Sequence, residues 1–148
     1  MEDYKSKKKV VLVGLYLPGI YPPGKDDVVA GLLSVALLKG TAEADPEIAS
    51  KYDLQILDIT TTTESSQIAA RISELEPDIV AYSVYIWNYD QVVESLSLIK
   101  KNQPNIKVIF GGPLVSYTPK EMLLDNPDAD IIVCGSGEGR FTQLLKSD

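Results

Sequence analysis

The stretch DIVAYSVYIWN, residues 78–88, decides how this chain folds. Its first six residues form a largely apolar run that is typical of a strand covered on both faces. Its last five residues carry two aromatic side chains and end on Asn88, where the sequence predicts that a helix begins. A strand that leads through a short loop into a helix is the repeating unit of a parallel α/β sheet.

The same pattern recurs on both sides of this stretch. Counting the stretch itself, the sequence predicts five strands, at Lys9–Gly14, Leu54–Ile59, Asp78–Ser83, Ile106–Phe110 and Asp130–Cys134. We therefore predict an α/β fold with a doubly wound five-stranded parallel sheet, flavodoxin-like or Rossmann-like, in the strand order 2-1-3-4-5. A length of 148 residues fits one domain over residues 1–148.

Amphipathic stretches predict five helices between and after these strands. The first is capped by Asp26 or Asp27, ends at Gly40 and buries Val28, Val29, Leu32, Leu33, Ala36 and Leu37. The second starts at Ser65 or Ser66, buries Ile68, Ile72 and Leu75 and ends at Pro77. The third covers Asp90–Asn102 and buries Val92, Val93, Leu96 and Ile99. A capping box at Thr118 opens a short fourth helix through Leu124, and a fifth starts near Gly139.

Composition restricts the classes of partner. The formal net charge of −7 disfavours general binding to nucleic acid, because an acidic surface repels phosphate backbones. No apolar run is long enough to span a membrane. Cys134 is the only cysteine, so neither an intrachain disulfide nor an iron–sulfur cluster held by several cysteines of this chain is possible. We expect a cytoplasmic protein.

Unusual loops follow three of the predicted strands: residues 84–88, Gly111-Gly112-Pro113 and residues 135–139, with the sequence GSGEG. In open α/β sheets, ligands bind beyond the carboxyl ends of the strands, and here the crevice is expected between strands one and three. Three such loops at one edge favour a single large, flat ligand.

Each loop also has a purely structural interpretation. The two glycines can admit a ligand to the backbone, or they can serve a tight turn that needs positive φ. Trp87 can pack between helix and sheet, and Asn88 can cap a helix. Residues 135–139 can present N–H groups to a phosphate or an amide, and Tyr16 can be a pocket wall or a surface residue.

Taken together, the loops resemble the cobalamin-binding domain of B12-dependent radical SAM proteins, over nearly the whole chain. The resemblance implies that Ser83, Gly111 and Gly112 line the channel for the cofactor's nucleotide tail. It places residues 84–88 beneath or beside the corrin ring and Gly135–Glu138 beside the ribose and base of the tail. The cofactor-binding residues expected from it are Tyr16, Leu17, Pro18, Ser83, Val84, Tyr85, Trp87, Asn88, Gly111, Gly112, Pro113, Val115, Gly135, Ser136, Gly137 and Glu138.

The chain contains no histidine, although another large group of B12-binding domains supplies one to cobalt from an Asp-x-His-x-x-Gly motif after the first strand. Residues 14–19, GLYLPG, occupy that place, with Tyr16 at the histidine position. A neutral phenol is a poor cobalt ligand at pH 7. We therefore expect base-off, His-off cobalamin, with water or an empty lower face and no protein metal ligand.

The resemblance implies a module that holds cobalamin for methyl transfer by a radical SAM enzyme, with the radical SAM domain in cis or in trans. That parent enzyme would also need a 4Fe–4S cluster and S-adenosylmethionine. This chain is not expected to bind them, because its single cysteine cannot hold the cluster. We expect no catalytic residue in this chain, which would be the N-terminal part of a longer protein or a free-standing relative. The alternative is a structural or interaction domain that keeps the fold without binding the cofactor.

Other functions of flavodoxin-like folds fit less well. A phosphoacceptor receiver should carry paired acids after the first strand and an aspartate after the third, where this chain has Gly14, Leu15 and Ser83. A flavodoxin needs a hydroxyl-rich loop after the first strand, but the hydroxyl-rich residues 60–63 follow the second. A Ser-His or Cys-His hydrolase is excluded, because the chain has no histidine.

Overall fold

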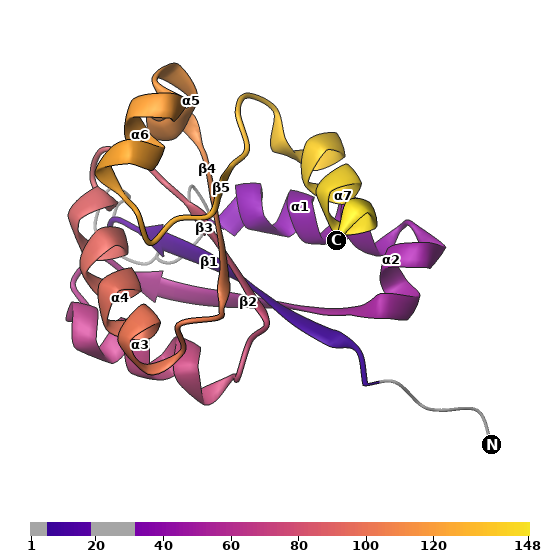
Figure 1. Cartoon of the computed structure of the whole chain (residues 1–148), viewed down its shortest axis with the longest axis horizontal. Coiled ribbons are helices and arrows are strands. Elements are labelled where there is room, and N and C mark those ends of the chain that lie inside the picture. Colours follow the sequence, from indigo (N-terminus) through magenta and orange to yellow (C-terminus); the bar gives the residue numbers. More distant parts are fainter. Residues whose placement is uncertain (1–5, 19–31) are drawn as a thin grey trace.

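The computed structural model describes residues 6–18 and 32–148, which form a single sheet with helices on both faces (Figure 1). Five strands pair in the order β2-β1-β3-β4-β5, and every pair is parallel. The strands are β1 (Lys8–Tyr16), β2 (Tyr52–Thr60), β3 (Ile79–Ser83), β4 (Lys107–Gly111) and β5 (Ile131–Ile132). The predicted fold class and strand order are confirmed.

The central strands are buried on both faces, as continuous apolar runs require. In β1, every side chain from Val10 to Leu15 is buried, and all five residues of β3 are buried. The edge strand β5 is shorter than predicted. Its ladder ends soon after Ile132, because the chain turns away at Gly135, whose φ is +69°.

Helices cover the two faces in separate groups (Figure 1). On one face lie α1 (Leu32–Glu43), α2 (Pro46–Lys51) and α7 (Gly137–Ser147). On the other lie α3 (Ser65–Glu74), α4 (Tyr89–Asn102), α5 (Pro113–Tyr117) and α6 (Pro119–Asp125). The short helices α2 and α5 were not predicted, although each begins with proline at the first helical position.

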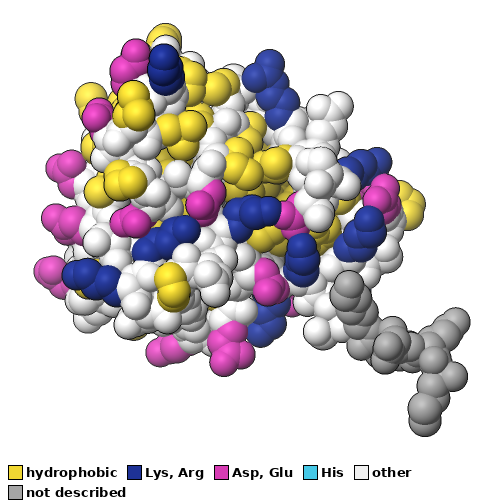
Figure 2. All heavy atoms as spheres, viewed as in Figure 1, with side chains coloured by type: hydrophobic (Ala, Val, Ile, Leu, Met, Phe, Trp, Pro, Cys, Tyr) yellow, Lys and Arg dark blue, Asp and Glu magenta, His cyan; other side chains and the backbone are white. Residues whose placement is uncertain are grey.

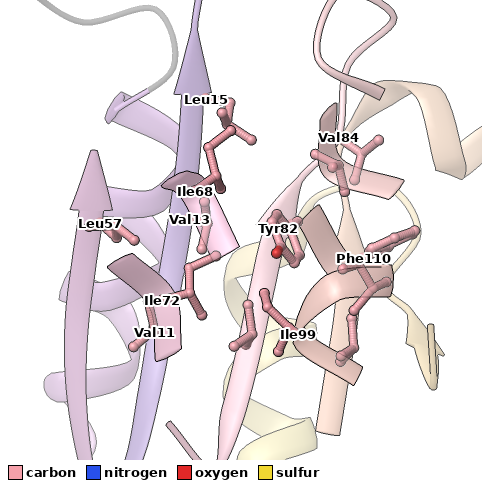
Figure 3. Close-up of a cluster of buried hydrophobic side chains, with 14 of the residues drawn as sticks. Val11, Val13, Leu15, Leu57, Ile68, Ile72, Tyr82, Val84, Ile99 and Phe110 are labelled. Carbon is pink, nitrogen blue, oxygen red and sulfur yellow. The ribbon is translucent and has the colours of Figure 1, made fainter. Parts of the chain in front are cut away.

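Two apolar cores follow from the period-two alternation of the strands. In β1, Val11, Val13 and Leu15 face α3 and α4, where they meet Ile68, Ile72 and Ile99 (Figure 3). Val10 and Leu12 face the opposite core, with Val35, Ile48 and Phe141. The predicted inward positions of α3 and α4 are confirmed for Ile68, Ile72, Val92, Leu96 and Ile99, whereas Val93 is only half-buried.

The predicted orientation of α1 is wrong. Its buried stripe is Val35, Leu38 and Ala42, whereas Leu33 and Leu37 are 55% and 47% exposed. The segment LLSVALL is apolar on almost every side of the helix. Its sequence therefore does not indicate which side faces the core. The helix also continues past Gly40 to Glu43. Asp26, Asp27, Val28 and Val29 lie outside the described residues.

Two predicted helix caps differ in detail. The N-cap of α3 is Glu64, and Ser65 is the first helical residue, with its hydroxyl donating to Glu94 at 2.7 Å. Thr118 does occupy the N-cap of α6, but its side chain makes no capping hydrogen bond. Both helices therefore start where expected without the predicted cap chemistry.

Charged side chains are scattered over the face shown in Figure 2, and apolar side chains gather in one part of it. Figure 2 shows hydrophobic side chains gathered over α5, α6 and the β5 edge, where Tyr117, Leu123 and Leu124 are exposed. Among the described residues, no helix has the length and apolar character needed to cross a membrane.

Candidate functional site

A cavity of about 210 Å³ opens at the carboxyl ends of β3 and β4, under α1 and the start of α7. Three layers of the fold meet there: the strand ends form the floor, α1 forms one wall, and the loop into α7 forms the other. The lining residues are Ser34, Val35, Leu38, Ala81, Tyr82, Ser83, Tyr85, Ile109, Gly111, Gly112, Val133, Gly135, Ser136, Gly137, Glu138 and Phe141.

The floor is hollow because small side chains meet on neighbouring strands. Ala81 pairs with Ile109, and Ser83 pairs with Gly111, in the register of β3 and β4. Alternation along the strands turns these four residues toward the face covered by α1 and α7, since Ala81 and Ile109 belong to that core. The side chains of Ala81 and Ser83 are small, and Gly111 has none. Together they leave space there that larger side chains would fill.

Gly112 lines the cavity and also has a positive φ, which was the structural alternative for this glycine. Its φ is +105°, and a Cβ at this position would stand 2.5 Å from the carbonyl oxygen of Val84 and 2.8 Å from its nitrogen. The missing side chain therefore makes room for the backbone of Val84, which donates to the Gly111 carbonyl oxygen at 2.7 Å. A side chain at position 112 would therefore clash with the backbone of Val84.

Two hydroxyl groups meet at the cavity wall. The Oγ atoms of Ser34 and Ser83 are 3.2 Å apart and link α1 to the end of β3. Ser83 is 8% exposed, and Ser34 is half-buried. The cavity is otherwise mostly apolar, so this pair is a localised polar point where a ligand nitrogen or hydroxyl could be bound.

The second wall is a glycine-rich turn that leads into α7. Ser136 is the N-cap of α7, and its hydroxyl donates to Oε2 of Glu138 at 2.7 Å. The Glu138 carboxylate also accepts its own backbone N–H, and these two hydrogen bonds lower the pKa of Glu138. Ser116 Oγ accepts the N–H of Gly135 at 3.0 Å, which ties the turn to α5. The wall therefore presents backbone and an anionic carboxylate that accepts hydrogen bonds.

Residues 84–88 carry an aromatic pair to the rim of the cavity. The rings of Tyr85 and Trp87 stack with centroids 4.5 Å apart and an interplanar angle of 14°. Tyr85 lines the cavity, whereas Trp87 is 44% exposed and Ile86 is 79% exposed. The alternative that Trp87 packs between helix and sheet is wrong, since its ring lies at the surface against Tyr85.

Asn88 lies beneath this loop and is 1% exposed. It occupies the N-cap of α4 but makes no capping bond there. Its Oδ1 accepts the N–H of Tyr85 at 2.8 Å, and its Nδ2 donates to the carbonyl oxygens of Ser83 at 3.0 Å and Leu15 at 3.2 Å. The amide thus joins the ends of β1 and β3.

Half of the predicted site residues surround the cavity, and half do not. Those in the lining are Ser83, Tyr85, Gly111, Gly112, Gly135, Ser136, Gly137 and Glu138. Val84 and Val115 are fully buried in the opposite core. Pro113 is the first residue of α5. Trp87 lies at the surface and Asn88 lies beneath the loop, as described above. Tyr16, Leu17 and Pro18 lie at the end of β1, outside the lining.

The described residues do not test the predicted crevice between strands one and three, because residues 19–31, which follow β1, lie outside them. The cavity is bounded by β3, β4 and the chain after β5, and the small residues on β3 and β4 explain this position. Sequence reasoning missed the wall residues Ser34, Val35, Leu38 and Phe141, and the floor residues Ala81, Ile109 and Val133. The floor residues Ala81 and Ile109 could have been predicted, because residues two apart in a strand lie on the same face, and these two stand two residues before Ser83 and Gly111.

The donor groups around the cavity suit an organic ligand. The described residues contain no group of three or more His, Cys, Asp or Glu side chains that could hold a metal ion. The cavity lining presents the carboxylate of Glu138, the hydroxyls of Ser34, Ser83 and Ser136, and an apolar floor. These groups fit a cofactor that brings its own metal chelate and binds through its organic parts.

Comparisons with known proteins identify the family of this chain. A family model described as the B12 binding domain matches residues 33–145. The chain is 33% identical over 141 residues to 2-(S-pantetheinyl)-carbapenam-3-carboxylate methyltransferase from Streptantibioticus cattleyicolor, over 95% of this chain and 19% of that protein. It is 34% identical over 143 residues to the cobalamin-dependent radical SAM methyltransferase TokK from Streptomyces tokunonensis, over 93% of this chain and 18% of that protein.

A solved structure shows the same fold. The cobalamin-dependent S-adenosylmethionine radical enzyme OxsB superposes with a TM-score of 0.66 at 20% identity, over 96% of this chain and 19% of that one. The chain spans about a fifth of the length of the two curated relatives described above. The family match covers most of the chain, from the start of α1 to the last turn of α7, and therefore contains all the lining residues of the cavity. This chain belongs to the B12-binding domain family.

Proposed function

We propose that this chain binds cobalamin in a base-off, His-off form, with the nucleotide tail in the cavity and the corrin ring across the carboxyl edge of the sheet. The observation that carries the proposal is the hollow at that edge, where Ser83 and Gly111 leave space under α1. Family membership makes cobalamin the cofactor to test at this position.

The cavity fits an aromatic base. Its volume of about 210 Å³ exceeds the roughly 150 Å³ of an apolar protein cavity that holds a benzene ring. Val35, Leu38 and Phe141 supply apolar contact on the helix side, and the Ser34–Ser83 hydroxyl pair can bond to a ring nitrogen. The dimethylbenzimidazole base of cobalamin has this combination of a flat apolar ring and one basic nitrogen.

The turn before α7 suits the sugar of the tail. The Glu138 carboxylate can accept hydrogen bonds from ribose hydroxyls, and the hydrogen bonds from its own backbone N–H and from Ser136 lower its pKa further. A Cβ at Gly135 would have nothing within 4 Å, so the backbone there is open to a ligand. We place the ribose beside Gly135–Glu138.

The rim suits the corrin ring. Trp87 and Ile86 are exposed at the end of β3, where a flat macrocycle could cover them. When bound, cobalamin supplies a cobalt centre that can carry a methyl group. The chain has no histidine, so no imidazole of its own can ligate cobalt.

The partner in methyl transfer would be a radical SAM domain, in the same polypeptide or in another one. The two relatives described above are methyltransferases, and this chain matches about a fifth of the length of each. Cys134 is the only cysteine in the sequence, so an iron–sulfur cluster for the radical chemistry would have to come from that partner. We place this module in the cytoplasm.

The test compares cobalamin with cobinamide, which lacks the nucleotide tail. Purified chain is titrated with each corrinoid, and bound corrinoid is measured after desalting. We expect the chain to retain hydroxocobalamin and to bind cobinamide at least about tenfold more weakly, because only cobalamin gains the contacts of the cavity. Gly111→Leu should remove this preference by occupying the floor.

Gly139→Leu is the matched control. A Cβ at Gly139 would have nothing within 4 Å, and this residue lies in α7 outside the cavity lining. This variant should keep the preference for cobalamin. Equal affinity of the parent chain for cobalamin and cobinamide would contradict the placement of the tail, and no retention of either corrinoid would contradict the proposed function.

A further inference from the structure

We propose that Asn88 is a positioning residue at the carboxyl edge of the sheet: its buried amide holds the aromatic loop 84–88 against the ends of β1 and β3. The inference rests on the proposed function for its consequence in binding. The geometry that carries it is independent of any ligand.

The Asn88 side chain makes three hydrogen bonds, to backbone groups from three places. It accepts from the N–H of Tyr85 within the loop and donates to Ser83 at the end of β3 and to Leu15 at the end of β1. The last bond spans 73 residues of sequence. In the described parts of the chain, β1 and β3 are backbone-paired only from Val10–Val13 to Ile79–Tyr82, so the amide extends their connection beyond the ladder.

Few side chains could replace this amide. The position needs a short side chain with one hydrogen-bond acceptor and two donors. This side chain must also be buried, since Asn88 is only 1% exposed. Aspartate offers no donor in its ionised form, and it would set a buried charge against two carbonyl oxygens. Serine has the one hydroxyl donor and is shorter, so it cannot serve Leu15 and Ser83 together.

The groups that Asn88 fixes are those that face the proposed cofactor. Ser83 supplies the hydroxyl at the cavity wall, and Tyr85 lines the cavity and stacks on Trp87. An unfixed loop would have to be ordered when the ligand binds, and that entropic cost lowers affinity. Asn88 therefore acts on binding through Ser83 and Tyr85, without touching the cavity itself.

The experiment uses the emission of Trp87, the only tryptophan of the chain, as a reporter of the loop. Asn88→Ser and Asn88→Asp are compared with the parent by far-UV circular dichroism, by acrylamide quenching of Trp87 without ligand, and by hydroxocobalamin titration. Loss of the Tyr85 stack should increase quenching of Trp87 in folded variants. Cobalamin affinity should fall by about tenfold or more, as expected for losing one or more buried hydrogen bonds that organise the site.

Asn126→Ser is the matched control. Asn126 is another buried amide, 4% exposed, and its Nδ2 donates to the Tyr89 hydroxyl and the Met122 carbonyl oxygen. This variant should lose stability while the quenching of Trp87 and the affinity for cobalamin stay as in the parent. It separates a local effect on the loop from a general loss of buried hydrogen bonds.

Three results would overturn the inference. Folded Asn88 variants with parental quenching would show that the amide does not hold the loop. Increased quenching with parental cobalamin affinity would show that the loop need not be held for binding. Loss of fold in both variants would make Asn88 a structural residue. If the parent itself retains no cobalamin, the proposed function fails, and the quenching comparison alone decides whether Asn88 orders the loop.

Discussion

Gly111 and Gly112 are adjacent at the end of β4, yet the structure separates their roles. Gly112 has a φ of +105° and touches the backbone of Val84, whereas a Cβ on Gly111 would meet only the Val133 carbonyl oxygen, at 3.8 Å. We predict that Gly112→Ala lowers the free energy of unfolding by about 1–3 kcal/mol from backbone strain, with more from the clash. Gly111→Ala should change it by less than about 0.5 kcal/mol.

Urea denaturation of both alanine variants measures this difference. The two variants serve as controls for each other, since each adds one methyl group at neighbouring positions. Equal stability of the two variants would contradict the assignment of Gly112 to backbone packing.

Trp87 allows a second prediction at the same scale. Its ring is 44% exposed and stacks on Tyr85, so little core packing depends on it. Trp87→Ala should lower the melting temperature only slightly, in line with a loss of at most about 1 kcal/mol, and it should weaken cobalamin binding. Thermal denaturation and corrinoid titration test the two effects separately. A large loss of stability with unchanged binding would mean that Trp87 is a packing residue after all.

Single residues also show what the sequence could predict about the site. Ser83, Gly111 and the turn at 135–138 were predictable because they stand at strand ends, and strand ends were readable from apolar runs. For Gly112 the sequence left open a ligand channel or a turn with positive φ, and its steric limit could not be predicted because it comes from Val84, which directly follows β3. Asn88 likewise resembled a helix cap, and only the tertiary fold brings Leu15 within reach of its amide.

At the scale of elements, α1 is the helix whose packing the sequence left open. Val35 is 1% exposed and faces the cavity and the core, whereas Leu37 is 47% exposed. Val35→Ala should lower the free energy of unfolding by about 1.5–3 kcal/mol, because a buried side chain is truncated. Leu37→Ala should cost less than about 0.5 kcal/mol. If Leu37→Ala proves the more costly of the two in chemical denaturation, the orientation of α1 is wrong.

The other elements show why α1 was the exception. In α3 and α4, polar residues separate the apolar ones, so the periodicity identifies the buried face, and Ile68, Ile72 and Ile99 are buried as predicted. The strands were readable from β-branched runs, and their order followed from the general rules of doubly wound folds. In α1 those contrasts are missing, and the helix rotation is fixed by tertiary contact with β1, β2, α2 and α7.

For the molecule as a whole, Asp148 links distant parts of the fold. Its carboxylate pairs with Lys107 at the start of β4 and with Lys8 at the start of β1, the latter at 2.6 Å, and it accepts from the Tyr52 hydroxyl at 3.3 Å. The hydrogen bond from Lys107, followed by that from Lys8, lowers the pKa of Asp148 to about 2. A lowered folded-state pKa stabilises the fold above the ordinary aspartate pKa.

This contribution should therefore be complete above about pH 4 and disappear as the pH falls toward 2. Asp148→Asn should lower stability at pH 7 and reduce the loss of stability between pH 4 and 2, as measured by urea denaturation at a series of pH values. A variant whose stability falls with acid as steeply as that of the parent would show that this cluster does not contribute to the pH dependence.

The most direct test of the central proposal is the visible spectrum of the chain after mixing with excess hydroxocobalamin and desalting. We predict a retained corrinoid with a base-off spectrum, since the tail would occupy the cavity under α1 and the chain has no histidine to replace it on cobalt. A colourless but folded protein would contradict the proposal and favour a domain that keeps the fold without the cofactor. A retained corrinoid with a base-on spectrum would contradict the placement of the tail.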